Sequence, residues 1–330
     1  MKKNNLENCL AGWKRIPVML LLTVAFFLFF AYGCGEPGDF TATGPEKEKP
    51  GTEERAEPRN AHEKKELKVA VSVVPQKTFV EKIAGDLAEV VLLVPPGYSP
   101  GNYEPTPQEM EDFSRASLYF SIGVPTEEAN ILPQARELDG LEIIDLHGKV
   151  GEHYPERQLE EEDSCGDHES RDPHIWLSPA RVKVMVEIMA EELARVDEAN
   201  SELYMQNARA YLEELEELDQ ELEEIFSNLE NRKFIVFHPA FGYLADDYDL
   251  QMYALEHGGK EATPQRMQEI IDLARKEDIR VIFYQEEIDS KQSETFAEEI
   301  GGQTVKLSPL ASNYVENLRL MAETMAEELQ

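Results

Sequence analysis

Cysteines, basic residues and long apolar runs are all scarce in this 330-residue sequence. Three cysteines, Cys9, Cys34 and Cys165, are too few for a framework of disulfide bonds. No glycine-rich loop ends in Gly-Lys-Ser or Gly-Lys-Thr, which excludes a P-loop nucleotide site. The HExxH motif of many zinc proteases is absent as well. These absences argue against an enzyme of those classes.

Basic residues number 32 against 66 acidic ones, which gives a formal net charge of −34. Residues 1–33 hold four basic and one acidic side chain, so the rest of the chain carries −37. Such an excess of negative charge argues against nucleic acid or an anionic membrane surface as a binding partner. A cationic ligand would be compatible with this charge. However, carboxylates such as those of Glu213, Glu214, Glu216 and Glu217 occupy predicted solvated helix faces, so the excess alone indicates an acidic surface and not a site.

A single long apolar run, from Ile16 to Tyr32, follows four basic residues. This pattern predicts a secretory signal over residues 1–33, because the run is short for a membrane span. Cys34 then stands where a lipoprotein signal places the cysteine that is acylated. The acidic stretch 34–66, which contains proline and glycine, predicts a disordered tether. The alternative is a transmembrane anchor that is never cleaved; both predict an exported protein.

From Leu67 onward, short apolar runs of strand type alternate with segments of helical periodicity. Strands are predicted near 68–74, 90–94, 118–122, 142–145, 233–237, 251–255, 281–284 and 303–307. Helices are predicted near 75–85, 108–114, 126–138, 241–248, 263–276, 290–299 and 314–329. The alternation predicts an α/β fold with parallel sheets wrapped by helices. It divides into an N-terminal lobe (67–178), linking helices (179–231) and a C-terminal lobe (232–330).

The linking segment predicts two helices. Ser178 followed by Pro179 is typical of a helix start, and a second helix from Ser201 to Glu230 would be about 45 Å long at 1.5 Å per residue. Apolar residues recur along it at gaps of four and three, which also fits a coiled coil, but the heptads are too few for a sustained one. We therefore expect one long rigid helix that joins two lobes.

Two histidines with neighbouring prolines flank the linking helices. His174 lies in DPHIWLSP (172–179), just before a predicted helix, and His238 follows the predicted strand 233–237 and precedes Pro239. Both positions are loop or strand ends, where functional side chains are common. We expect the two histidines to face one cleft between the lobes.

Periodicity disappears between His147 and Arg171, where His147, His153 and His168 are scattered among acidic residues. This composition predicts a polar surface loop. The alternative is a loop that collects metal weakly.

Four separated motifs together resemble one family. They are VPPGYSPGNYEPTPQEM (94–110), DPHIWLSP (172–179), FHPAFGY (237–243) and IFYQEEIDSKQSETFAEEIGGQTVKLSPL (282–310). The sequence is similar in these motifs, and over nearly everything from Leu67 onward, to the metal-specific solute-binding lipoproteins of ABC importers for zinc and manganese. The resemblance implies two (β/α)₄ lobes joined by one long rigid helix, with the metal bound in the cleft between the lobes.

The family usually supplies four metal ligands, and two carry over to this chain as His174 and His238. Gly101 stands where the family has a ligand histidine, and Ser308 stands where it has an aspartate. Asp172 would hydrogen-bond an imidazole from behind and orient it, as carboxylates near metal sites do.

Two imidazoles alone would hold zinc weakly, because zinc prefers four N, S or O ligands in a tetrahedron. Asn102 or Glu104 of the first motif, Glu286 or Glu287 of the last, or water could complete the set. Gln285 occupies a position that is often glutamate in the family. A mixed set of nitrogen and oxygen ligands favours a harder or less discriminating site than a dedicated zinc site.

The resemblance implies a substrate-binding subunit that captures a divalent transition metal for import, zinc first and manganese next. We expect no enzyme activity and no cofactor besides this transported metal. The expected partners are the permease and ATPase of an ABC importer, and the protein should be a monomer held by the lipid on Cys34 to the outer face of the bacterial cytoplasmic membrane. Two alternatives remain: an adhesin-like interaction protein that kept the fold without the metal, and a metal-dependent hydrolase.

Overall fold

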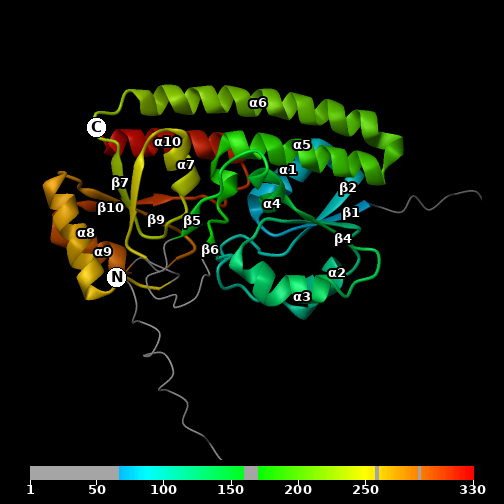
Figure 1. Ribbon diagram of the computed structural model, residues 1–330, viewed down its shortest axis with the longest axis horizontal. Helices are drawn as coiled ribbons and strands as arrows, with labels where there is room; N and C mark the ends of the chain where they lie inside the picture. Colours follow the sequence, from blue (N-terminus) through cyan, green and yellow to red (C-terminus); the bar gives the residue numbers. More distant parts are fainter. Residues whose placement is uncertain (1–66, 160–169, 257–259, 289–290) are drawn as a thin grey trace, which may run out of the picture. The chain divides into compact units, whose positions relative to one another are not determined.

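The computed structural model describes residues 67–159, 170–256, 260–288 and 291–330 (Figure 1). The chain divides after Asn60, and all of these residues belong to the unit that follows. The predicted signal, Cys34 and the predicted tether lie outside the described residues. Within the described ranges, no helix is long and apolar enough to cross a membrane.

Two four-stranded parallel sheets form the centres of two lobes, as predicted. The order is β2-β1-β3-β4 in the first lobe and β10-β9-β7-β8 in the second, so the two sheets have equivalent topologies. The strands are β1 (Leu67–Val71), β2 (Ala88–Leu92), β3 (Leu118–Ser121), β4 (Glu142–Asp145), β7 (Lys233–Val236), β8 (Gln251–Ala254), β9 (Val281–Gln285) and β10 (Gln303–Leu307). In each lobe the carboxyl ends of the strands meet at one edge of the sheet, the usual place for a ligand.

Helices cover the sheets, and apolar side chains of the helices and the strands pack together between them (Figure 1). In the first lobe they are α1 (Val74–Ala84), α2 (Pro107–Phe113), α3 (Leu132–Ala135) and α4 (Leu146–Gly151), and in the second α7 (Gly242–Asp247), α8 (Pro264–Lys276), α9 (Lys291–Ile300) and α10 (Tyr314–Glu328). One buried cluster extends from Val69 of the first sheet to Phe283 of the second. The two lobes therefore share part of their core.

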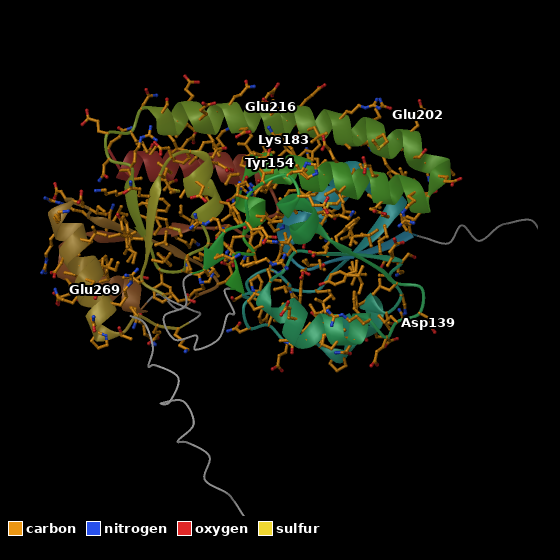
Figure 2. The ribbon with its side chains drawn as sticks, viewed as in Figure 1. Asp139, Tyr154, Lys183, Glu202, Glu216 and Glu269 are labelled. Atoms are coloured by element: carbon orange, nitrogen blue, oxygen red, sulfur yellow. The ribbon has the colours of Figure 1, made fainter. Side chains whose placement is uncertain are left out.

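The linking helices are α5 (Pro179–Val196) and α6 (Ser201–Ser227). Ser178 caps α5 by accepting a hydrogen bond from the backbone N–H of Arg181 (3.1 Å). Helix α6 has 27 residues and is therefore about 40 Å long at 1.5 Å per residue. Figure 2 shows Lys183 of α5 close to Glu216 of α6, and its Nζ lies 2.5 Å from Glu216 and 3.0 Å from Asp219.

One face of α6 is apolar and buried along its whole length. It packs against α5, against α1 of the first lobe and against α10 of the second lobe (Figure 1). The buried side chains are Tyr204, Ala208, Tyr211, Leu215, Leu218, Leu222 and Phe226. Full burial of one large apolar side chain stabilises a protein by about 1.5–3 kcal/mol, so this face binds the helix firmly to both lobes. The long joining helix is thus part of a helical layer of the protein, and its heptad-like spacing reflects this packing.

Two segments differ from the predicted pattern. The predicted helix 126–138 forms as a π-helical turn (Glu127–Ile131) followed by the short α3, because Pro133 has no N–H for a continuous α-helical ladder. The segment predicted as a surface loop instead begins with α4, whose N-terminus is capped by Asp145, and continues into a short antiparallel pair, β5 (Gln158–Leu159) and β6 (Ser170–Arg171). These elements are too short to give a periodic pattern.

Candidate metal centre

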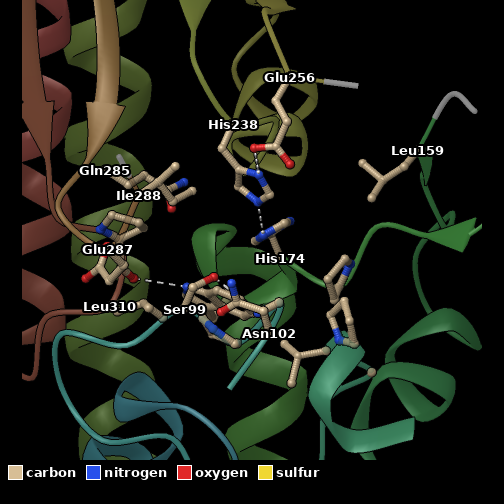
Figure 3. A pocket seen from close by; sticks show the side chains of 18 of the residues that line it. Ser99, Asn102, Leu159, His174, His238, Glu256, Gln285, Glu287, Ile288 and Leu310 are labelled. Carbon is tan, nitrogen blue, oxygen red and sulfur yellow. Dashed lines mark hydrogen bonds and ion pairs between the residues drawn. The ribbon is translucent and has the colours of Figure 1, made fainter. Parts of the chain in front are cut away.

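The cleft between the lobes is a cavity of about 1130 Å³ (Figure 3). Residues of both lobes line it, at the carboxyl edges of the two sheets. Its polar and charged lining consists of Ser99, Asn102, Glu128, Arg171, His174, His238, Glu256, Glu261, Gln285 and Glu287. Carboxylates outnumber cationic groups in this lining, so the cavity favours a positively charged ligand.

His174 reaches the cavity from the loop before α5. It immediately precedes a 3₁₀ turn, Ile175–Leu177, whose side chains are buried in the core. The Asp172 side chain is fully buried, and its Oδ1 accepts hydrogen bonds from the backbone N–H of His174 (3.0 Å) and from His174 Nδ1 (2.7 Å). The carboxylate thus sets the orientation of the imidazole ring and directs Nε2 into the cavity.

His238 reaches the cavity from the second lobe, two residues after β7. Its Nδ1 lies 2.8 Å from Oε2 of Glu256. Strands β7 and β8 pair with Val236 opposite Ala254, so the residues two positions further along each strand lie side by side. Glu256 was not among the residues that the sequence singled out. The signal that could have identified it is its position directly after the strand next to that of His238.

The two imidazoles face each other, as Figure 3 shows, with Nε2 of His174 3.3 Å from Nε2 of His238. A carboxylate is only an acceptor, so each neutral ring donates its Nδ1–H to Asp172 or Glu256 and keeps a lone pair on Nε2. Burial lowers the pKa of His174, which favours the neutral ring, although the charge of Asp172 opposes this. Two lone pairs then point at each other, and a cation between them would remove the repulsion.

The spacing of the two nitrogens fits a zinc ion. Zinc binds imidazole nitrogen at about 2.0–2.1 Å in a tetrahedron, which separates two such nitrogens by about 3.3–3.4 Å. The observed distance between the Nε2 atoms is 3.3 Å. Both Nδ1 atoms are already engaged with carboxylates, the arrangement that is common behind metal-bound histidines. The residues present therefore fit two ligands of a tetrahedral metal site.

The other predicted ligands lie in different surroundings. Asn102 lines the cavity. Glu104 is exposed and is not among the residues that line the cavity. Glu286 is also exposed and pairs with Lys306, with Nζ 3.2 Å from its carboxylate. The structure therefore brings neither Glu104 nor Glu286 to the imidazole pair.

Glu287, next to Glu286, does line the cavity. Its Oε2 is buried and has no hydrogen-bond partner among the residues that the structure describes, and burial raises the pKa of this carboxyl group. Within the described ranges, however, no three side chains of His, Cys, Asp or Glu are grouped closely enough to hold a metal ion on their own. Glu287 is thus near the site but is not a third member of it in this conformation.

The loop that contains Gly101 forms another part of the cavity wall. It is attached to the first lobe by hydrogen bonds from the backbone N–H of Thr126 to the carbonyl oxygen of Pro100 (3.1 Å) and from Asn130 Nδ2 to that of Tyr103 (3.0 Å). Gly101 does not have a positive φ angle, and a Cβ atom there would meet only Ser99 Oγ, at 3.4 Å. The position of the absent family histidine thus has room for a side chain.

The histidines of the segment 147–168 do not form a group in the described residues. His147 is buried, and its Nε2 donates to the backbone carbonyl oxygen of Asp172 (2.9 Å). His153 is exposed, and His168 lies outside the described residues. The prediction of a surface loop is therefore wrong for His147, whose ring supports the segment that carries His174.

The fold and the site define a class of protein: a two-lobed protein with a cleft between its lobes, in which two imidazoles lie at a spacing that fits a metal ion. The chain belongs to the family described as zinc-uptake complex component A, periplasmic, which matches residues 69–328. The family suggested by the four motifs is thereby confirmed.

Relatives and solved structures agree with this assignment. The high-affinity zinc uptake system protein ZnuA of Bacillus subtilis is 30% identical over 254 residues, which cover 74% of this chain and 78% of that protein. The zinc-binding lipoprotein AdcA of Streptococcus pneumoniae is 29% identical over 286 residues, 79% of this chain but 56% of that longer protein. A crystal structure of a ZnuA is 36% identical, with a TM-score of 0.74, and the match covers 80% of this chain and 99% of that one.

Proposed function

We propose that this protein captures Zn²⁺ outside the cytoplasm and delivers it to the permease of an ABC importer. The observation that carries this proposal is the pair of Nε2 atoms 3.3 Å apart, each on a ring whose Nδ1 is engaged by a carboxylate. Membership of the zinc-uptake family supports zinc as the cargo. His174 and His238 are the two proposed protein ligands, with Asp172 and Glu256 behind them.

The remaining coordination positions would be filled by water or by oxygen atoms of the cavity wall. Asn102 and Glu287 both line the cavity and carry oxygen atoms suited to zinc or manganese. Because the chain supplies two imidazoles and not three, we expect weaker zinc binding than a full family ligand set would give. A third ligand that is an oxygen would also bring the affinity for Mn²⁺ closer to that for Zn²⁺.

The protein acts as a carrier and not as an enzyme in this proposal. Gly97–Gly101 has the letters of a GxSxG motif, but the next helix begins only at Pro107, whereas the nucleophile of such hydrolases stands on a tight turn between a strand and a helix. Ser99 Oγ accepts a hydrogen bond from the backbone N–H of Gly101 (3.2 Å). A reactive serine is therefore not part of the proposal.

Anchoring by a lipid on Cys34 completes the proposal, with the protein working as a monomer beside the importer's permease and ATPase. The apolar run before Cys34 and the acidic stretch after it support an anchor, and the relative AdcA is named a lipoprotein. Cys34→Ser should lower the mass by a lipid and release the protein from membranes, as measured by mass spectrometry and fractionation. Unchanged mass and membrane retention would contradict the anchor.

Calorimetric titration of the purified, metal-free protein with Zn²⁺ tests the central claim. We expect one zinc ion per chain, and no binding at this site when His174 and His238 are both alanine. His153→Ala is the matched control, because His153 is exposed and does not line the cavity. A double variant that binds zinc like the unchanged protein would exclude the imidazole pair. A protein that binds no metal would favour the metal-free interaction protein instead.

A further inference from the structure

The second carboxylate oxygen of Asp172 faces an arginine. Oδ2 of Asp172 lies 3.4 Å from Nε of Arg157, and neither atom has a hydrogen-bond partner within the described residues. The Asp172 side chain is fully buried, and that of Arg157 is 28% exposed. A buried carboxylate requires a compensating charge. Arg157 supplies that charge, while the other oxygen of Asp172 holds His174.

Helix α7 of the second lobe holds this arginine in place. Nη1 of Arg157 lies 2.6 Å from Oδ1 of Asp246. The hydroxyl of Tyr243 accepts a hydrogen bond from the backbone N–H of Arg157 (3.1 Å) and donates one to the backbone carbonyl oxygen of Asp172 (3.1 Å). The backbone N–H of Asp172 in turn donates to the carbonyl oxygen of Arg157 (2.9 Å). One helix of the second lobe thus contacts both members of the charge pair in the first.

A glycine of α7 makes room for the pair. A Cβ atom at Gly242 would lie 2.8 Å from both Cζ of Arg157 and Oδ2 of Asp172, closer than carbon atoms approach these groups. Any side chain at this position would push the arginine off the carboxylate. Oδ2 of the buried Asp172 is as close to this Cβ as Cζ of Arg157 is, so a side chain here would displace both groups and separate the pair.

The segment with these groups also carries the second imidazole. His238, Gly242, Tyr243 and Asp246 lie within nine consecutive residues at the start of α7. The same short segment therefore presents one imidazole itself and orients the other through Arg157 and Asp172. A common support of this kind holds two ligand atoms at a constant separation, which a metal site requires.

We propose that Arg157 is a positioning residue for the metal ligand His174, and that Gly242 is needed because the Arg157–Asp172 pair lies directly over it. This inference rests on the proposed function, since it concerns how the imidazole pair is held. Arg157 does not touch the metal; it fixes the carboxylate that fixes the ring. Loss of such a partner behind a metal ligand typically weakens metal binding by about 10–100-fold.

Zinc titration of Arg157→Gln and Gly242→Ala tests the proposal, and we expect each variant to bind zinc about 10–100-fold more weakly. Arg157→Lys keeps the charge but cannot contact Asp172 and Asp246 together, and it should recover part of the affinity. Arg232→Gln is the matched control. Arg232 is 33% exposed, donates to the backbone carbonyl oxygen of Tyr248 (3.0 Å) and should matter for stability alone.

Two further measurements separate positioning from general stability. The visible absorption bands of the Co²⁺-loaded protein report ligand geometry, and they should change in Arg157→Gln and Gly242→Ala but not in Arg232→Gln. Arg157→Gln should also cost no further affinity when His174 is already alanine, because it acts through that ring. When His238 is alanine and His174 is intact, Arg157→Gln should still weaken zinc binding by about the full 10–100-fold.

Unchanged zinc affinity and Co²⁺ bands in both Arg157→Gln and Gly242→Ala would overturn the inference and leave the proposed function standing. Equal losses from Arg157→Gln with and without His174 would overturn it as well. Failure of the unchanged protein to bind zinc would overturn the proposed function, and the inference with it.

Discussion

The two walls of the cleft present their imidazoles in different ways. On the first-lobe wall, His174 is 11% exposed and rests on Asp172, which is fully buried and surrounded by backbone, tyrosine and arginine groups. On the second-lobe wall, His238 is 23% exposed and rests on Glu256, which is itself 11% exposed. The first imidazole is held by a buried network, and the second by a carboxylate at the surface of the cavity.

A second buried carboxyl group supports the first-lobe wall. Glu127 is fully buried and accepts hydrogen bonds from the backbone N–H groups of Ile122 (2.9 Å) and Gly123 (2.7 Å) and from the hydroxyl of Ser72. Gly123 lines the cavity beside this group. The first-lobe wall is therefore organised by buried carboxyl groups and their hydrogen bonds, and the second-lobe wall is the more adaptable side of the site.

Removal of either imidazole should have the largest effect. We expect His174→Ala and His238→Ala each to weaken zinc binding by about 1,000-fold, or roughly 4 kcal/mol, because a single imidazole holds the ion only weakly. His174→Ala should be the worse by a few-fold, since its ring is already oriented before the metal arrives. Calorimetric titration measures both. If His238→Ala weakened zinc binding more than His174→Ala does, the second-lobe wall and not the first would hold the more important imidazole.

The buried carboxyl group of Glu127 should make stability depend on pH. Burial raises its pKa from 4.5 to about 7, so the folded protein keeps this proton where the unfolded chain has lost it. Below pH 4.5 the carboxyl group is protonated in both the folded and the unfolded protein, so its ionisation does not affect the free energy of unfolding. Between the two values the free energy of unfolding should fall as the pH rises, by roughly 3 kcal/mol in total, and should then level off.

Urea unfolding of the unchanged protein and of Glu127→Gln at several pH values measures this dependence. The difference in the free energy of unfolding between the two proteins should vary between about pH 5 and 7 and be constant above about pH 8. Taking the difference removes the contribution of the other acidic residues. A pH-independent difference would show that Glu127 ionises as in the unfolded chain.

The two carboxylates behind the imidazoles should differ in importance. Asp172→Asn should weaken zinc binding by about 100-fold and Glu256→Gln by about 10-fold, the two ends of the range for groups behind metal ligands. The reason is that Asp172 belongs to a larger buried network, whereas water can partly replace Glu256. The ratio of the two dissociation constants is the quantity to measure. Equal effects would mean that burial of the network adds nothing to the orientation of His174.

The smallest effect concerns the empty ligand position on the first-lobe wall. Gly101→His should tighten zinc binding by about 10-fold, or about 1.4 kcal/mol, because it adds an imidazole to an existing site. The backbone conformation and the open space at Gly101 accept a side chain without strain. Zinc titration and thermal melts of the variant check affinity and fold together. A stable variant with unchanged affinity would mean that this loop does not approach the imidazole pair.

The main outline of the fold followed from the sequence. The alternation of apolar runs and helical periodicity predicted all eight strands of the two parallel sheets, most clearly where a central strand such as β1 or β9 is a nearly continuous apolar run. The long helix was predicted from its uninterrupted apolar stripe. The short elements β5, β6 and α4 were missed, since they are stabilised by their neighbours and have no periodicity of their own.

The candidate site was predictable in its parts but not as an arrangement. Both histidines and Asp172 stand in sequence motifs, so the sequence identified them. The choice between Glu286 and its neighbour Glu287 depends on which carboxylate turns into the cavity, and the turn that follows β9 decides this. Glu256 contacts His238 only because β7 and β8 lie in register.

The sequence by itself determined the kind of protein: which segments are strands and helices, that two lobes are joined by a long helix, and that an imidazole is available in each lobe. These properties are local, because propensity, periodicity and short motifs act over a few neighbouring residues. Tertiary structure decided the 3.3 Å separation of the two Nε2 atoms and the contacts of Arg157 with Asp172 across Gly242. These depend on groups up to 89 positions apart, such as Arg157 and Asp246, and only packing of the whole core brings such groups within hydrogen-bonding distance.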